Sequence, residues 1–163
     1  MRLQKGIGIW DQIAEKAQPI LEIKVSQGRA GDGAGPFFLH FDHAELEEGP
    51  MGHMCEDRHL RRALLDAMAH EDRISIVEEQ VVNQSVSPRG VSLDLASGQT
   101  LSAKLLIGCD GRGSGTATRA GIKRTGWSFG QTALVAAVEH EHPHNGIAHQ
   151  FFMPQGPLAI LPL

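Results

Sequence analysis

Residues 105–115, LLIGCDGRGSG, place an aspartate and several glycines directly after an apolar run. Ligands bind at the carboxyl ends of strands in open α/β sheets, so this pattern favours a nucleotide phosphate site. Asp110 could accept a hydrogen bond from a ribose hydroxyl, Gly111 would let the backbone approach the ligand, and amides opening a following helix would favour an anion. A tight turn with an aspartate cap fits the same residues, and their spacing does not separate the two interpretations.

Single positions exclude three common loops here. A dinucleotide fingerprint G-x-G-x-x-G that began at Gly111 would need a third glycine where Thr116 stands. A P-loop needs Gly-Lys-Ser/Thr, which the sequence lacks. A nucleophile elbow around Ser114 would need glycines on both sides, at the positions of Arg112 and Thr116.

The histidine-rich stretch EHEHPHNGIAH is a second candidate site. Alternate strand residues share a face, so His140 and His142 could chelate a metal together with Glu139 or His149. Pro143 interrupts the strand just before the next histidine, and no acidic partner is evident that would orient the imidazoles. We therefore expect exposed histidines at a hairpin end and no metal.

Composition bounds the class of protein. The chain has 163 residues, 41% of them apolar and 21% charged, as is ordinary for one domain or one domain with a lobe. A net charge of −4 gives no reason to expect nucleic acid as a partner. No stretch approaches the roughly 20 apolar residues of a membrane span, so we expect a cytoplasmic protein. Cys55 and Cys109 are expected to be reduced thiols, with Cys109 buried behind an apolar strand.

Hydrophobic periodicity predicts the elements that would position these residues. One helix or two short ones are expected before Pro19, and a clear amphipathic helix at 58–71 with Asp57 as its cap. A glycine-rich loop is expected at 27–36 and a short helix at 114–121. The predicted strands cover 20–26, 37–46, 73–78, an antiparallel meander at 80–86, 91–96 and 99–104, a buried parallel strand at 104–111, and further strands within 131–141, 146–154 and 157–163.

These elements indicate an α/β fold with a mainly antiparallel lobe. Two features favour a piece of something larger. A buried parallel strand implies neighbouring strands, and the apolar run GPLAILPL stops without a polar tail. We expect bare apolar edges of this kind to be covered by self-association.

LLIGCDGRGS followed by AGI resembles the aspartate–glycine motif of the class A flavoprotein aromatic hydroxylases, the para-hydroxybenzoate hydroxylase type. EDRHLRRALL, GWSFGQTALVAAVEHEHPHNGIAHQFFMP and GPLAILPL resemble the ubiquinone-biosynthesis branch, and within it most closely the 2-octaprenyl-6-methoxyphenol hydroxylase type. The resemblance implies a partial Rossmann-like FAD/NAD(P)-binding domain at 1–18 and 53–123, with a substrate-binding sheet lobe at 19–52 and 124–163. It also implies FAD and NAD(P)H as cofactors and O2 as a substrate.

The resemblance also assigns cofactor residues. It implies that Asp110 and Gly111 lie near the FAD pyrophosphate and take part in NAD(P)H binding, and Ser114 matches the serine of the motif. The family's arginine three residues later is replaced by Ala117, and Arg119 is the nearest arginine, which puts part of the NAD(P)H site in doubt.

The segment EDRHLRRALL matches a family segment whose arginine approaches the flavin pyrophosphate, and Arg58 is its counterpart. A guanidinium suits a diphosphate geometrically. A solvated first-turn arginine beside Glu56 and Asp57 fits the same position. No catalytic residue is assigned, because the hydroxylation chemistry belongs to the cofactor.

Two flavin motifs of the family, the opening G-x-G-x-x-G turn and a late glycine–aspartate motif, are absent from the sequence. The resemblance therefore implies an internal fragment of an enzyme that hydroxylates a polyprenyl phenol, inactive alone and in peripheral contact with the inner membrane. Phenylalanines of the sheet would form an apolar substrate wall, although core packing is the stronger explanation for any single phenylalanine. The alternative is a non-catalytic lipid-binding or assembly module that retains the substrate lobe.

Overall fold

The computed structural model describes residues 1–163, except for the side chain of Ala34. The chain forms two compact units, one made of Met1–Ile74 with Val138–Leu163 and the other of Ser75–Ala137. Helices and strands are both present, and most strand pairs are antiparallel, which confirms the predicted α/β class. The predicted division into a flavin part and a substrate part is functional, and it stays a prediction.

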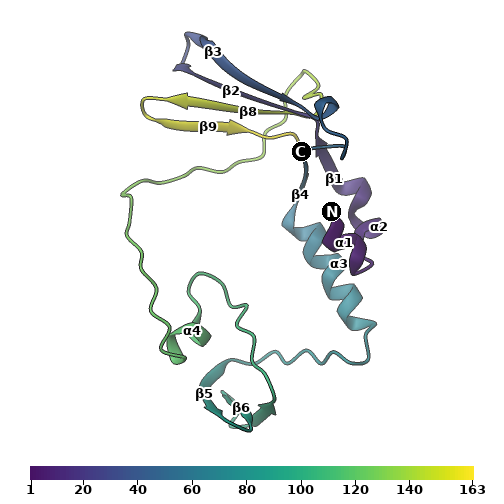
Figure 1. Cartoon of the computed structure of the whole chain (residues 1–163), viewed down its shortest axis with the longest axis vertical. Helices are drawn as coiled ribbons and strands as arrows, with labels where there is room; N and C mark the ends of the chain where they lie inside the picture. The colour runs from purple at the N-terminus through teal and green to yellow at the C-terminus, as the bar shows by residue number, and fades with distance from the viewer. The chain divides into compact units, whose positions relative to one another are not determined.

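The helices of the first unit pack around a small apolar core (Figure 1). They are α1 (Arg2–Gly6), α2 (Trp10–Ile13), the 3-10 turn η1 (Ala14–Lys16) and α3 (Asp57–Ala69). Gly8 separates α1 from α2 with a φ of 77°, a left-handed conformation that suits glycine. The two-helix alternative is therefore the correct one. Ile9, Ile13 and Ala63 are buried together, which joins α2 to the middle of α3.

Asp57 does not cap α3 as predicted. The N-cap residue is Glu56, whose side chain makes no capping hydrogen bond. Asp57 is the first helical residue, and its carboxylate accepts hydrogen bonds from the Arg61 guanidinium at 2.9 and 3.2 Å. The prediction is therefore one residue out, and the Asp57 carboxylate instead pairs with the arginine one turn further along the helix.

Strands complete the first unit (Figure 1). A two-stranded antiparallel pair leads from the helices to a sheet with the order β3-β2-β8-β9. The paired strands are β1 (Ala17–Ile20) and β4 (Gly52–Cys55), and the sheet contains β2 (Glu22–Arg29), β3 (Gly33–Asp42), β8 (Ile147–Met153) and β9 (Gly156–Ile160). β2 pairs with β8 in parallel, and the other two pairs are antiparallel. The 3-10 turn η2 (His43–Glu45) follows β3.

The glycine-rich stretch 27–36 is not the predicted loop. β2 and β3 extend into it and leave only a short turn between them. Gly28 allows this because a Cβ there would lie 2.8 Å from the carbonyl oxygen of Gly33 on the partner strand. Gly28 therefore allows the two strands to lie close together, and it does not mark a flexible loop.

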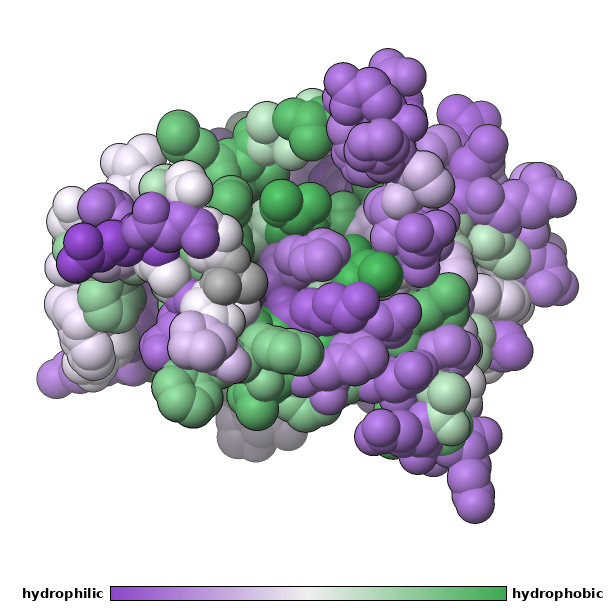
Figure 2. All heavy atoms as spheres, turned by 90° about the horizontal axis from the view of Figure 1, so that it is seen from above, coloured by the Kyte–Doolittle hydropathy of each residue, from purple (hydrophilic) through white to green (hydrophobic). Residues whose placement is uncertain are grey.

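Apolar side chains remain exposed on β3, with Phe37, Phe38 and Leu39 each more than half exposed. Figure 2 shows hydrophobic surface lying open among hydrophilic side chains on the face it displays. Phe37 and Phe38 are therefore not packed into a core within the described chain, whereas Phe151 of β8 is half-buried.

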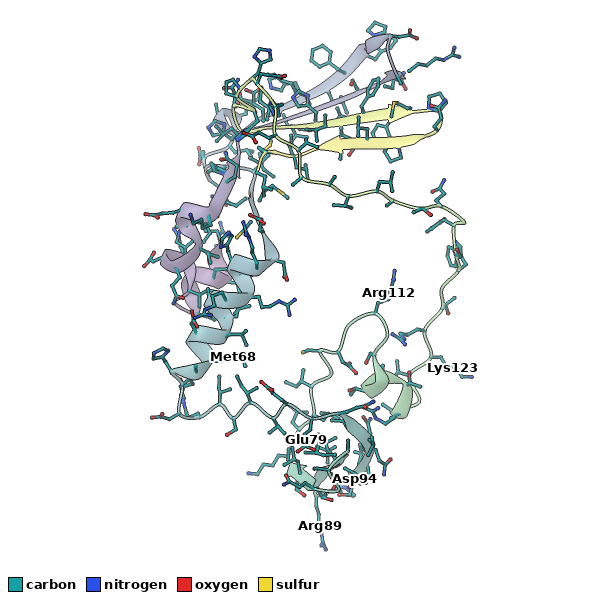
Figure 3. All side chains as sticks on the ribbon, turned by 180° about the vertical axis from the view of Figure 1, so that it is seen from behind. Met68, Glu79, Arg89, Asp94, Arg112 and Lys123 are labelled. Carbon is teal, nitrogen blue, oxygen red and sulfur yellow. The ribbon has the colours of Figure 1, made fainter. Side chains whose placement is uncertain are left out.

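The second unit contains the predicted antiparallel meander and short helix. Its elements are β5 (Val81–Ser87), β6 (Gly90–Leu95), β7 (Thr100–Ala103) and α4 (Gly115–Arg119). β6 lies between β5 and β7, and its Val91 and Leu95 are buried. Arg89, in the turn between β5 and β6, points outward (Figure 3).

The predicted strands at 73–78, 104–111 and 131–141 are wrong, because these segments form no ladder with any described strand. Leu105 and Ile107, expected inside a covered sheet, are 71% and 72% exposed. Cys109 is exposed rather than buried, and it is not bonded to Cys55. An apolar run supplies the side chains of a buried strand, but a strand also needs a hydrogen-bonding neighbour.

Candidate functional site

Asp110 organises the loop that the sequence singled out. The Ser114 hydroxyl donates a hydrogen bond to Oδ1 of Asp110 at 2.5 Å, and the backbone N–H of Thr116 donates to Oδ2 at 2.9 Å. These two donors, the serine first, hold the pKa of Asp110 well below its ordinary value of 3.8. Asp110 is therefore an ionised, exposed acceptor at neutral pH, and its carboxylate has lone pairs left for a ligand hydroxyl.

Ser114 and Gly111 give the loop its shape. Ser114 is the N-cap of α4, and its Oγ accepts a hydrogen bond from the backbone N–H of Ala117 at 3.0 Å. Gly111 has a φ of 78°, which a residue with a Cβ adopts only with strain. No atom lies within 4 Å of where a Cβ on Gly111 would stand, so a ligand can approach the backbone there.

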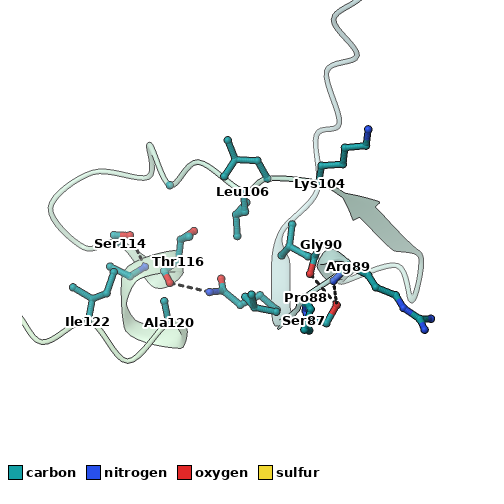
Figure 4. A pocket seen from close by; sticks show the side chains of 16 residues that line it. Ser87, Pro88, Arg89, Gly90, Lys104, Leu106, Ser114, Thr116, Ala120 and Ile122 are labelled. Atoms are coloured by element: carbon teal, nitrogen blue, oxygen red, sulfur yellow. Dashed lines mark hydrogen bonds between the residues drawn. The ribbon is translucent and has the colours of Figure 1, made fainter.

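Gly108 and Ser114 line a groove of about 670 Å³ within the second unit (Figure 4), whereas Asp110 and Gly111 lie beside it and do not line it. Thr116 of α4 and Ala120, the C-cap of α4, line one side, and the turn 87–90 lines another. Lys104 contributes a cation, and Leu106 an apolar side chain. The volume of the groove and its combination of polar and apolar lining residues suit part of a nucleotide or a ring with polar substituents.

Arg58 lies in the first unit, in the first turn of α3, so the structure does not group it with Asp110, Gly111 and Ser114. Its guanidinium donates to Oε1 of Glu56 at 2.6 Å, and this bond holds the pKa of Glu56 below its ordinary value. The Arg58 side chain is 71% exposed. Exposed ion pairs contribute only about 0–1 kcal/mol, so a diphosphate could displace the glutamate at little cost.

The histidine stretch forms no metal centre in the described part of the chain, where no group of three or more histidine, cysteine, aspartate or glutamate side chains is placed to hold an ion. His140 and His142 lie outside any strand, so they do not share the predicted strand face. His149 lies in β8, opposite Lys24 of β2. Among the described helices, none has the length and apolar character needed to cross a membrane.

The sequence analysis missed Gln84, and it named Arg119 without predicting the contact that Arg119 makes. Nε of Arg119 in α4 donates a hydrogen bond to Oε1 of Gln84 in β5 at 3.2 Å. Nε2 of Gln84 in turn donates to the carbonyl oxygen of Thr116 at 3.1 Å. No sequence pattern marks these contacts, because Gln84 and Thr116 are 32 positions apart. Arg112 is a cation within the aspartate–glycine motif, but its side chain extends away from α4 (Figure 3).

The chain belongs to a flavin-binding class of protein: residues 1–156 match the FAD binding domain family, and the chain is a member of that family. The predicted fold, a partial Rossmann-like FAD/NAD(P)-binding domain with a mainly antiparallel sheet lobe, is thereby confirmed.

Named relatives narrow the class. The chain is 42% identical over 163 residues to the ubiquinone hydroxylase UbiL of Rhodospirillum rubrum, covering 99% of this chain and 37% of that protein. It is 32% identical over 175 residues to the mitochondrial ubiquinone biosynthesis monooxygenase COQ6 of Rattus norvegicus (99% and 35%). It is 29% identical over 163 residues to the 3-demethoxyubiquinol 3-hydroxylase of Escherichia coli (99% and 40%). The predicted resemblance to the ubiquinone-biosynthesis hydroxylases is confirmed, and the chain spans well under half of the length of these relatives.

Proposed function

We propose that this chain is part of an FAD-dependent, NAD(P)H-using monooxygenase that hydroxylates a polyprenyl phenol with O2 in ubiquinone biosynthesis. The observation that carries the proposal is the 42% identity, over 99% of the chain, to a protein named as a ubiquinone hydroxylase. The chain spans 37% of that relative, which supports the further proposal that it is an internal segment, inactive alone. The same proposal includes the 2-octaprenyl-6-methoxyphenol hydroxylase type, and it assigns no ring position.

The candidate residues fit an FAD or NAD(P)H group by their chemistry. Asp110 is a fixed, ionised acceptor for a ribose hydroxyl, and Gly111 leaves open space beside its backbone. Arg58 carries an exposed guanidinium that suits a diphosphate. The reduced flavin would supply the activation of O2, while these residues bind and orient.

The four-stranded sheet supports a substrate role for 19–52 and 124–163. Its exposed phenylalanines on β3 suit the apolar tail of a prenylated ring. A lipid-tailed substrate is also the reason to propose peripheral contact of a cytoplasmic protein with the inner membrane. Exposed apolar sheet edges are the reason to propose self-association of the chain. No relative reported above is described as a binding or assembly module, so the alternative gains no support.

A chimera tests the proposal. This chain would replace the matching 163-residue stretch of the Rhodospirillum rubrum relative, and FAD titrations followed by flavin fluorescence would compare the chimera with the chain alone. We expect the chimera to bind FAD and restore ubiquinone formation in cells that lack the host enzyme, and the chain alone to bind weakly. A chimera that binds FAD but forms no ubiquinone would contradict the substrate class.

A matched pair of aspartates locates the cofactor contact in the chimera. Asp110→Ala should weaken FAD or NAD(P)H binding about tenfold, the value of one hydrogen bond to a charged group. Asp94→Ala is the control, because Asp94 also accepts two hydrogen bonds, from Asn83 and Thr100 within the meander. Equal losses in the two variants would assign the effect to folding of the unit rather than to the cofactor.

A further inference from the structure

Helix α4 follows the Asp110 loop and has only five residues. Isolated helices of this length are unstable in water, so something outside α4 must hold it. What holds α4 also holds the loop, because Ser114 is both the N-cap of α4 and a hydrogen-bond donor to Asp110.

Thr116 is the residue on which these holds converge. Its N–H donates to Asp110, and its carbonyl oxygen accepts from the Gln84 side-chain amide. Its methyl group packs against Gly108, where an added Cβ would lie 2.9 Å from Cγ2 of Thr116. A shift of Thr116 would therefore disturb the Asp110 carboxylate directly.

Gln84 uses both ends of its amide. Nε2 donates to Thr116 and Oε1 accepts from Nε of Arg119, at opposite ends of α4. Across the described residues, the hydrogen bonds between α4 and the meander are these two. Gln84 is half-buried on β5, whereas its neighbour Asn83 is exposed and bonds Asp94 within the meander.

We propose that Gln84 is a positioning residue for the cofactor loop: together with Arg119 it clamps α4 to the meander and, through Thr116, fixes Asp110. This inference rests on the proposed function only where it takes the Asp110 loop to face the cofactor. It also gives Arg119 a role, since Arg119 serves the clamp rather than replacing the arginine that the family has at Ala117. The amide is specific to the task, because it donates to a carbonyl and accepts from a guanidinium at once.

The test compares Gln84→Ala with Asn83→Ala in this chain. Amide hydrogen exchange is measured at Thr116 and Ala117, and the Asp110 carboxyl is titrated by NMR. Gln84→Ala should speed exchange at both amides about tenfold, as expected for the loss of two hydrogen bonds. It should also raise the pKa of Asp110, because a displaced Thr116 N–H no longer stabilises the carboxylate. Asn83→Ala should change neither quantity.

Two further variants sharpen the result. Gln84→Glu keeps the acceptor for Arg119 but loses the donor to Thr116, so its effects should lie between those of wild type and Gln84→Ala. Arg119→Ala releases the clamp from the α4 side. It replaces Gln84→Ala in the test if faster exchange at the meander amides shows that Gln84→Ala unfolds β5–β7. The proposal is overturned if releasing either side leaves exchange and titration unchanged, or if Asn83→Ala has an equal effect.

FAD affinity of the chimera separates this inference from the proposed function. Gln84→Ala in the chimera should weaken FAD or NAD(P)H binding severalfold, while Asn83→Ala should not. If the unmodified chimera fails to bind FAD, the proposed function fails, and the exchange and titration measurements still decide whether Gln84 positions the loop. Accelerated exchange with unchanged FAD and NAD(P)H affinity would overturn the cofactor part of the inference.

Discussion

The helices α3 and α4 begin in opposite ways. The N-cap of α3, Glu56, makes no side-chain capping bond, yet α3 runs for thirteen residues. The N-cap of α4, Ser114, makes its capping bond and is tied to Asp110 as well, yet α4 ends after five residues. Burial of Ala63 against α2 stabilises the long helix, whereas polar contacts stabilise the short one.

The candidate ligand residue of α3 therefore does not stabilise its helix, whereas the candidate ligand residues beside α4 do. Arg58 sits on a helix that is stabilised by its core contacts, so exchanging its Glu56 partner for a ligand would cost that helix little. Asp110 and Ser114 hold their own loop together, so a ligand there would meet groups that are already fixed. Preorganised groups lose less freedom on binding, which favours the Asp110 loop as the more rigid contact.

The largest effect should come from removing the core under α3. Ile13→Ala should lower the free energy of unfolding of the first unit by about 2–5 kcal/mol, because it leaves a cavity beside Ala63. Trp10, packed against the same core, reports this unfolding by fluorescence in a Trp127→Phe background. Leu3→Ala is the control, since Leu3 is 70% exposed, and it should cost far less. Similar losses in both variants would show that this core does not stabilise the unit.

Strain in the Asp110 loop gives the next effect. Gly111→Ala places a Cβ at a φ of 78° and should destabilise the loop by about 1–2 kcal/mol. Gly113→Ala is matched, because Gly113 has no positive φ and nothing lies within 4 Å of its Cβ position. Amide exchange at Thr116 and Ala117 measures the cost. Equal exchange in the two variants would mean that the loop does not need the left-handed conformation.

Removing the cap of α4 should cost somewhat less. Ser114→Ala should destabilise α4 by about 1 kcal/mol and should raise the pKa of Asp110 toward 3.8, since the serine is the larger cause of its lowering. Because the folded pKa is depressed, Asp110 contributes stability above its ordinary pKa that is lost as pH falls below about 3.8 toward the folded value.

The acid dependence of the same variant checks that sign. Ser114→Ala should make exchange at α4 less sensitive to pH below 4, because less carboxylate stabilisation remains to be lost. Thr116 still donates to Asp110 in the variant, so the pKa should stay below its ordinary value. Amide exchange as a function of pH measures the first quantity, and carboxyl titration by NMR measures the second. If Asp110 has the same pKa in the variant as in the wild-type chain, Ser114 does not cause the lowering.

The local parts of this arrangement could be predicted from the sequence, and the long-range parts could not. The meander and α4 follow from nearby turn signals and caps. The segment 104–111 has the composition of a buried strand, but pairing depends on a neighbour that composition does not specify. Gln84 reaches Thr116 across 32 positions, and no periodicity marks that contact. The cofactor roles came from resemblance, because spacing left Asp110 open between ligand and cap.

The smallest effect on stability should come from Arg58, and it is the sharpest test of the comparison. Arg58→Ala and Arg61→Ala remove equally exposed arginines from the same helix, each paired with one carboxylate. Both should change stability by less than about 0.5 kcal/mol, because exposed pairs on α3 contribute little beside its core. In the chimera, Arg58→Ala alone should weaken FAD binding, by about tenfold if the guanidinium meets a phosphate. Equal FAD affinity in the two variants would leave Arg58 a solvated first-turn residue and would assign the cofactor contacts of this chain to the Asp110 loop.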